Sequence, residues 1–341
     1  MAMSSTSSSP RVSSAATSPS RRWRDLAILL VLLALVVAGL LGLALATGWE
    51  ETLEAIRALT GVELVILLLL SLVNYVFRGL RWHLFAGRLG LSLSLGANLR
   101  HFLGGFAMSV TPGRVGELVR MRWIRRETGW SFERTAPLVL MDRASDLAAM
   151  ALLLAVALMF STGGIAGALP VAILALIAAW VVTRPDLMHR LASVGYRLVG
   201  RRLPRLFARI RRAARALESF TAPSLLVVAA LLGLIGWAAE GWAFHLLLTW
   251  MGAEIGMMTA IAIFVFATLA GGVTGAPGGL GGAEAAMVAL LVLNGVALEI
   301  AVPATLIIRV TTLWFAIGIG FLVFPAAERL SKKAEHALET D

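Results

Sequence analysis

The sequence predicts an all-α polytopic membrane protein, with about six spanning helices and two re-entrant helical hairpins arranged as inverted-topology repeats. Of its 341 residues, 59% are hydrophobic, and the mean hydropathy is +0.85. Several apolar runs exceed the roughly 20 residues that a helix needs to cross a bilayer. Two short Pro-Gly stretches, 165 residues apart, interrupt this apolar background and predict the repeats.

The charge and composition restrict the class of function. The net charge is +10, and the only lysines are Lys332 and Lys333. Because the arginines cluster between apolar segments, we expect anionic lipid headgroups as partners, and no nucleic acid. Without cysteine there is no thiolate metal site, and without an earlier lysine there is no G-x-x-x-x-G-K nucleotide loop. The histidines have no metal-binding spacing, so we expect no catalytic residue, cofactor or metal; the oligomeric state stays unassigned.

The N-terminal region is predicted to form a tail and an anchor. Residues 1–20, mostly Ser, Ala, Thr and Pro, lack the apolar content to fold and are expected to be a disordered cytoplasmic tail. In residues 21–48, Arg21, Arg22 and Arg24 precede an apolar run. That run exceeds the roughly 7 to 15 apolar residues of a signal peptide, although it ends in Ala-Leu-Ala like a cleavage site. We therefore favour a retained anchor helix over a cleaved signal.

The first predicted repeat, residues 62–160, consists of a span, a hairpin and a span. Arg78, Arg81 and Trp82 end the first span, where an interfacial anchor is an alternative to a functional site. The hairpin turns at residues 111–117, TPGRVGE, and basic residues lie on both sides of it, including Arg120 in its second arm. This pattern indicates that the hairpin enters and leaves by the cytoplasmic face.

A linking span, residues 165–183, leads to a basic cytoplasmic segment, residues 184–222. Ten arginines occur in residues 184–215, with apolar residues at helical spacing between them. These are Leu203, Phe207, Ile210, Ala214 and Leu217. The pattern predicts an amphipathic helix on the cytoplasmic leaflet, although a solvated basic linker remains open because Pro204 weakens a helix.

The second predicted repeat, residues 223–325, has the same order of elements. Its hairpin, residues 256–294, contains no Arg or Lys, so we expect it to enter from outside. The tail, residues 326–341, carries Lys332 and Lys333. Both termini are therefore predicted to be cytoplasmic, in a multi-pass protein of the cytoplasmic (inner) membrane.

The two turns carry matching elements in opposite orientation. After TPGRVGE, Arg143 lies 31 residues beyond Pro112; after APGGLGGAE, Arg309 lies 32 residues beyond Pro277. Inverted repeats of this kind are typical of transporters whose site lies between the halves. Chance similarity between Gly- and Pro-rich loops is the alternative.

The turns also predict the site. Non-helical backbone at membrane depth lines a wet or protein-enclosed cavity, and a half-helix N-terminus together with arginine favours a phosphate. The candidate substrate-binding residues are Arg81, Thr111, Arg114, Glu117, Arg143, Glu284 and Arg309. The candidate hinges are Pro112, Gly113, Gly116, Pro277, Gly278, Gly279 and Gly281. Supporting residues are Arg78, Trp82, Asp142, Asp146, Glu240 and Trp314.

A purely structural interpretation of these charges is also open. Glu117 and Glu284 fit first-turn acids that stabilise a helix dipole, and Arg143 and Arg309 fit their structural partners. Charges within a membrane are costly, so a set this large favours a functional role.

An ordered set of motifs resembles the flippase-like integral membrane family that also forms the transmembrane region of bacterial lysylphosphatidylglycerol synthases. The motifs are RGLRW (78–82), TPGRVGE (111–117), the Asp142-Arg143 pair, PGGLGGAE (277–284) and residues 309–314. The resemblance covers about residues 62–324. It implies a membrane protein without the soluble aminoacyl-transferase domain. In the larger synthases, the comparable region is associated with moving the modified lipid across the bilayer. The second turn has an extra Gly and no equivalent of Arg114, which implies asymmetric phosphate binding.

From these observations we expect a flippase for a phospholipid, an aminoacylated phospholipid or a polyprenyl-phosphate lipid. The alternative is an accessory membrane subunit, or an enzyme, of lipid or lipid-linked sugar modification, with a transferase partner. A structural scaffold is a third interpretation.

Overall fold

The computed structural model describes residues 54, 57–109, 111, 116–161, 168–200, 202, 207–208 and 215–340, and these form helices and connecting turns, without strands. The predicted tail 1–20, the anchor 21–48 and the turn residues Pro112, Gly113 and Arg114 lie outside this description. So do the side chains of Glu117 and Pro277.

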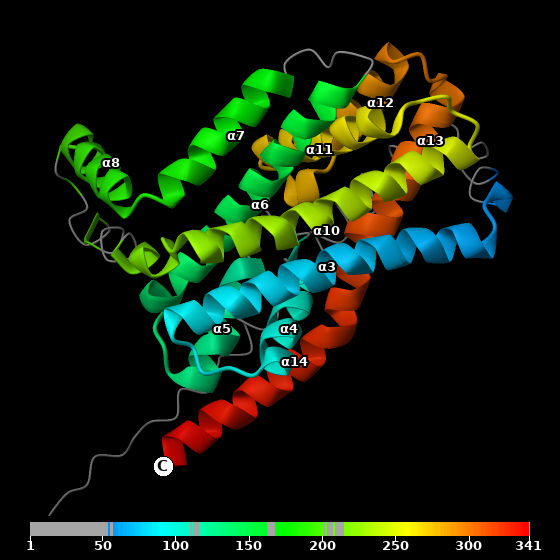
Figure 1. Cartoon of the computed structure of the whole chain (residues 1–341). Helices are drawn as coiled ribbons and strands as arrows, with labels where there is room; N and C mark the ends of the chain where they lie inside the picture. Colours follow the sequence, from blue (N-terminus) through cyan, green and yellow to red (C-terminus); the bar gives the residue numbers. More distant parts are fainter. Residues whose placement is uncertain are drawn as a thin grey trace, which may run out of the picture.

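Two groups of helices make up most of the fold (Figure 1). The first unit contains α3 (Gly61–Leu89), α4 (Leu95–Gly104), η1 (Gly105–Met108), α5 (Gly116–Thr128) and α6 (Phe132–Phe160). The second unit contains α10 (Pro223–Trp250), α11 (Met257–Val273), η4 (Pro277–Gly279), α12 (Gly282–Leu293), α13 (Leu298–Arg309), η5 (Val310–Trp314) and α14 (Phe315–Thr340). Between them lie α7 (Ala168–Val182), α8 (Pro185–Leu198) and η3 (Leu217–Phe220).

Local sequence sets the ends of the helices. At the start of α3, Thr60 and Glu63 form a capping box, each side chain bonded to the other's backbone N–H. Gly90 ends the same helix at φ +87°, which a residue with a Cβ rarely adopts. At the other end of the chain, α13 continues through the π-helical η5 into α14, so the predicted tail 326–341 is helical up to Thr340.

The helices confirm a polytopic membrane protein. In the described part of the chain, α3, α6, α10 and the continuous α13–α14 are long and apolar enough to cross a bilayer. The pair α7 and α8, bent by 96°, adds a fifth if it counts as one span. Large apolar side chains such as Met159 (79% exposed) and Leu322 (82% exposed) face outward, as expected in lipid. The predicted six crossings, the re-entrant hairpins and their inverted orientation stay predictions.

Helices of the first unit pack against helices of the second. Helices α3 and α10 run antiparallel side by side (Figure 1), and a Cβ on Gly236 would lie 3.3 Å from Cα of Asn74. Helix α4 of the first unit packs against α14 of the second, and α11 of the second packs against α6 of the first. The second helix of each unit, α4 or α11, therefore packs against the last helix of the other unit.

Two glycines of α14 test this packing. A Cβ on Gly320 would lie 2.2 Å from the backbone N of Ala107 in η1, whereas a Cβ on Gly318 would meet nothing within 4 Å. We expect Gly320→Ala to destabilise the fold by about 1–3 kcal/mol through overpacking. Gly318→Ala is the control and should be neutral or stabilising by up to about 1 kcal/mol. Thermal unfolding of the purified variants in detergent measures both; equal melting temperatures would contradict the α14–η1 contact.

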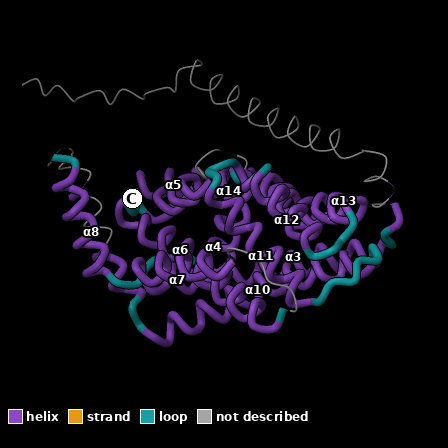
Figure 2. Tube along the Cα trace, turned by 90° about the horizontal axis from the view of Figure 1, so that it is seen from above, coloured by secondary structure: helices purple, strands orange, loops and turns teal. Residues whose placement is uncertain are grey.

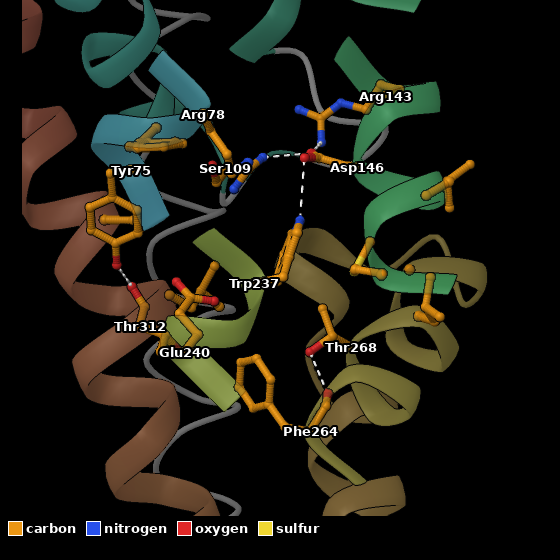
Figure 3. A pocket seen from close by; sticks show the side chains of 18 of the residues that line it. Tyr75, Arg78, Ser109, Arg143, Asp146, Trp237, Glu240, Phe264, Thr268 and Thr312 are labelled. Atoms are coloured by element: carbon orange, nitrogen blue, oxygen red, sulfur yellow. Dashed lines mark hydrogen bonds and ion pairs between the residues drawn. The ribbon is translucent and has the colours of Figure 1, made fainter. Parts of the chain in front are cut away.

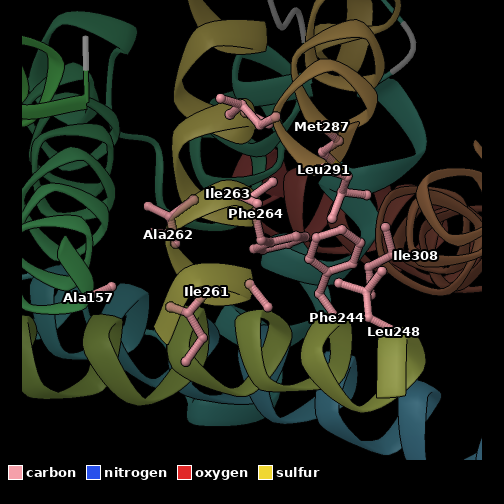
Figure 4. Packing of buried hydrophobic residues seen from close by; sticks show 14 of the residues in the cluster. Ala157, Phe244, Leu248, Ile261, Ala262, Ile263, Phe264, Met287, Leu291 and Ile308 are labelled. Atoms are coloured by element: carbon pink, nitrogen blue, oxygen red, sulfur yellow. The ribbon is translucent and has the colours of Figure 1, made fainter. Parts of the chain in front are cut away.

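Two apolar cores flank the middle of the molecule. One joins α10, α11, α12 and α13 with parts of α6 and α7, and includes Phe244, Phe264, Met287, Leu291 and Ile308 (Figure 4). The other joins α3, α4, η1 and α6 with the start of α10. Residues of both cores line the candidate site, including Phe264 of the first core and Tyr75 of the second.

The basic linking segment lies at the edge of the helical body. Helix α8 stands apart from the central helices in both views (Figures 1 and 2). Of the predicted amphipathic positions, Phe207 and Leu217 are buried; Leu203, Ile210 and Ala214 lie outside the described residues. The predicted continuous helix through this segment therefore stays a prediction.

Candidate functional site

A cavity of about 360 Å³ lies between the two units (Figure 3). Helices α3, α5 and α6 line it from the first unit, and α10, α11 and α13 line it from the second. Its polar and charged lining residues are Tyr75, Arg78, Ser109, Arg120, Arg143, Asp146, Trp237, Glu240, Thr268, Arg309 and Thr312. Both units therefore supply charge to one cavity.

Asp146 is the centre of the charged network on the first unit. Its Oδ2 lies 2.7 Å from Nη2 of Arg78, and its Oδ1 lies 2.6 Å from Nη2 of Arg81. The same nitrogen of Arg81 is 2.7 Å from Oδ1 of Asp142. Arg143 approaches Asp146 at 3.6 Å. Because Asp142 and Asp146 are four residues apart on α6, they share one face of that helix, which is turned toward α3.

Arg309 ties the second turn to α13. Its Nε lies 2.6 Å from Oε1 of Glu284, and its Nη2 donates to the carbonyl of Gly278 at 2.6 Å. Gly278 has φ +61°, a conformation that favours glycine. The π-helical turn begins directly after Arg309, and there the carbonyl of Thr312 accepts a hydrogen bond from the hydroxyl of Tyr75. Such π-helical turns occur frequently at functional sites.

Arg120 is a functional candidate that sequence reasoning missed. We expected it to mark the cytoplasmic side of the hairpin, but it is 3% exposed and lines the cavity. Its Nη2 donates to the carbonyl of Phe102 at 2.9 Å, and its guanidinium lies 4.4 Å from the ring centroid of Phe102. The available signal was its place three residues after Glu117, on the same face of the half-helix that follows the turn.

The other predicted residues fall into two groups. Arg143, Arg309 and Gly278 line the cavity, together with the supporting residues Arg78, Asp146 and Glu240. Among the described residues, those that do not line it are Arg81, Thr111, Trp82, Asp142, Glu284, Gly279, Gly281 and Trp314.

The interfacial-anchor interpretation of the RGLRW stretch does not fit the structure. Arg81 and Trp82 are fully buried, and Arg78 is 8% exposed. These side chains do not snorkel to a membrane surface, because Arg78 and Arg81 pair with Asp146 of α6 and Trp82 packs against Phe102 of α4. Asn74, Arg78 and Arg81 are spaced at i, i+4 and i+7, which places them on the face of α3 toward Asp146. That spacing was the signal for a buried polar face.

Sequence reasoning also missed several uncharged lining residues. They are Tyr75, Ser109, Trp237, Thr268 and Thr312. Trp237 donates its indole N–H to Oδ1 of Asp146 at 3.4 Å, and Arg78 lies 5.1 Å from its ring centroid. Isolated aromatic and hydroxyl residues inside apolar helices carry no distinctive spacing, so no sequence signal indicated them.

The chemistry of the cavity favours an anion. Four arginines (Arg78, Arg120, Arg143 and Arg309) and two carboxylates (Asp146 and Glu240) line it. Guanidinium groups bind phosphate oxygens through paired, charge-assisted hydrogen bonds. Apolar residues including Leu147, Met150 and Phe264 complete the wall, so water is partly excluded and each charge acts more strongly.

Comparisons with known proteins agree on a membrane family. Residues 27–320 match the family model described as the lysylphosphatidylglycerol synthase TM region. A UPF0104 membrane protein of Methanothermobacter thermautotrophicus is 23% identical over 318 residues, which cover 86% of this chain and 94% of that protein. A second UPF0104 membrane protein of the same organism is 29% identical over 106 residues, 31% of each chain.

Proposed function

The chain belongs to the family of the lysylphosphatidylglycerol synthase transmembrane region, and from this premise we propose that it is a flippase for an anionic, phosphate-bearing lipid. It moves the lipid across the cytoplasmic membrane. The headgroup enters the cavity between the units while the acyl chains stay in the bilayer. The observation that carries this proposal is the excess of arginine in a cavity to which both units contribute.

Arg143 is the arginine best placed to receive a phosphate. Its side chain is 27% exposed, against 10% for Arg78 and 9% for Arg309. Its distance to Asp146, 3.6 Å, is also longer than the 2.7 Å of the Arg78 pair. A phosphate at this position gains a close, charge-assisted contact with this partly exposed guanidinium. Arg78 of α3 and Arg309 of α13 also line the cavity and add positive potential.

The packing of the helices supports an inverted repeat as the framework of transport. The antiparallel α3 and α10, together with the exchange of α4 onto α14 and α11 onto α6, form the pairs that a two-fold relation between the units requires. In transporters with such repeats, rocking of one repeat against the other opens the site to each side in turn. In this scheme the positive-φ residues Gly278, Gly279 and Gly281 serve as the hinge of the second turn.

Lipid co-purification tests the proposal. We expect native mass spectrometry of the gently purified protein to show an anionic phospholipid enriched over the bulk membrane. Arg143→Gln should lower that occupancy about 10-fold or more, because a charged hydrogen bond is worth about 1.5–3 kcal/mol. Arg88→Gln, an exposed change at the end of α3, is the matched control and should keep the lipid.

The outcome also separates the flippase from the accessory-subunit interpretation. If the wild type and both variants carry only bulk lipid, the phosphate site is wrong. A transferase recovered in the same preparation, with no enriched lipid, would then favour an accessory subunit.

A further inference from the structure

Glu240 differs from the other buried carboxylates of the site. It lies on α10, is 4% exposed and lines the cavity. Asp142, Asp146 and Glu284 each form an ion pair of 2.6–2.7 Å with an arginine. Among the described residues, Glu240 forms no hydrogen bond and no ion pair, and its carboxylate points into the space between α10 and the π-helical turn (Figure 3).

The charges that face Glu240 come from three helices. Arg78 and the phenol of Tyr75 face it from α3, Arg309 from α13, and Asp146 from α6; α11 contributes the uncharged Thr268. The two arginines already have close carboxylate partners in Asp146 and Glu284. Their attraction for Glu240 is therefore largely offset, and an ionised carboxylate without a partner in an apolar interior is costly. Such a group takes up a proton in preference to staying charged.

We propose that Glu240 is a proton-binding site, and that one proton binds together with the anionic headgroup. This inference rests on the proposed function, because it requires the phosphate to occupy the same cavity. An arriving phosphate brings negative charge beside Glu240 and disfavours its ionised form. The protonated acid no longer repels the phosphate and gains an O–H that donates to a phosphate oxygen.

Proton and lipid therefore assist each other's binding. Coupling between two ligands is reciprocal, so whatever the phosphate does for the proton, the proton does for the phosphate. In a flippase, this coupling lets a pH difference across the membrane drive the lipid toward one leaflet. Through Glu240, a proton gradient can supply the energy for transport in a chain that has no G-x-x-x-x-G-K nucleotide loop.

A binding titration with soluble dihexanoyl phosphatidylglycerol tests the inference. Its phosphodiester keeps one negative charge from pH 5 to about 9, so any pH dependence in this range belongs to the protein. In the pH range where the lipid-free Glu240 is ionised, we expect wild-type affinity to fall by up to about tenfold per unit rise in pH. In that range, binding in weak buffer should take up as much as one proton per lipid. Glu240→Gln, a permanently neutral isostere, should bind without pH dependence and without proton uptake.

The controls separate failure of this inference from failure of the proposed function. Glu240→Asp should restore the pH dependence, and Glu299→Gln, an exposed change in the first turn of α13, should behave as wild type. Wild-type binding without proton uptake at every pH from 5 to about 9, or an unchanged pH dependence in Glu240→Gln, would overturn the proton site and leave the phosphate site standing. No binding of the lipid by the wild type would overturn both.

Discussion

Replacing Asp146 by asparagine should strongly destabilise the protein. Its two oxygens hold Arg78 and Arg81 at 2.6–2.7 Å, and Arg143 lies 3.6 Å away. An amide in place of this carboxylate removes the ion-pair partner of Arg78 and leaves Arg81 paired with Asp142 alone. Removing one member of a buried ion pair costs about 3–5 kcal/mol, because the remaining charge is buried without compensation.

Tryptophan fluorescence during thermal unfolding in detergent measures this loss, since the chain has 10 tryptophans. The matched control is Asp186→Asn in the first turn of the peripheral α8, where the carboxylate is exposed. We expect a change within about 0.5 kcal/mol there. Equal stability of the two variants would show that the Asp146 network does not hold α6 to α3.

The buried pair between Arg309 and Glu284 should behave as a coupled unit. Arg309→Gln alone leaves the carboxylate of Glu284, 5% exposed in its side chain, without a partner, at a cost of about 3–5 kcal/mol. The double variant Glu284→Gln with Arg309→Gln removes both charges, and we expect it to recover at least half of that loss. A double-mutant cycle on unfolding free energies measures the coupling.

The same double variant distinguishes a structural role from a functional one. If Arg309 only holds the second turn in place, the refolded double variant keeps its anionic lipid. Our account predicts that it folds and yet loses the lipid, because the positive charge is gone from the cavity wall. Strictly additive single effects on stability would contradict the pairing itself.

Sequence predicted the helices of this fold well, and for a plain physical reason. Apolar runs longer than a bilayer's thickness form helices whatever surrounds them. The repeats predicted at 62–160 and 223–325 begin with α3 and α10, and the first ends with α6. The Pro-Gly stretch at residues 276–284 also ends one helix and starts the next, α11 and α12, where the sequence predicted a turn.

The partners of the charges were harder to predict. Arg78 meets Asp146 across 68 residues, and Arg309 meets Glu284 across 25. These pairings depend on how the helices dock, which apolar periodicity does not specify. Arg120 shows the same limit, because a run of arginines looks like a cytoplasmic boundary until packing buries one of them against Phe102.

Lipid translocation in reconstituted vesicles shows directly whether the protein is a flippase. The protein is reconstituted with a trace of fluorescent phosphatidylglycerol, and dithionite then bleaches only fluorophores that reach the outer leaflet. Our account predicts that wild-type vesicles lose the inner-leaflet signal as well, that Arg143→Gln vesicles lose far less of it, and that a fluorescent phosphatidylcholine is moved poorly. Wild-type vesicles that bleach no further than protein-free ones, with the protein folded and correctly inserted, would contradict a flippase.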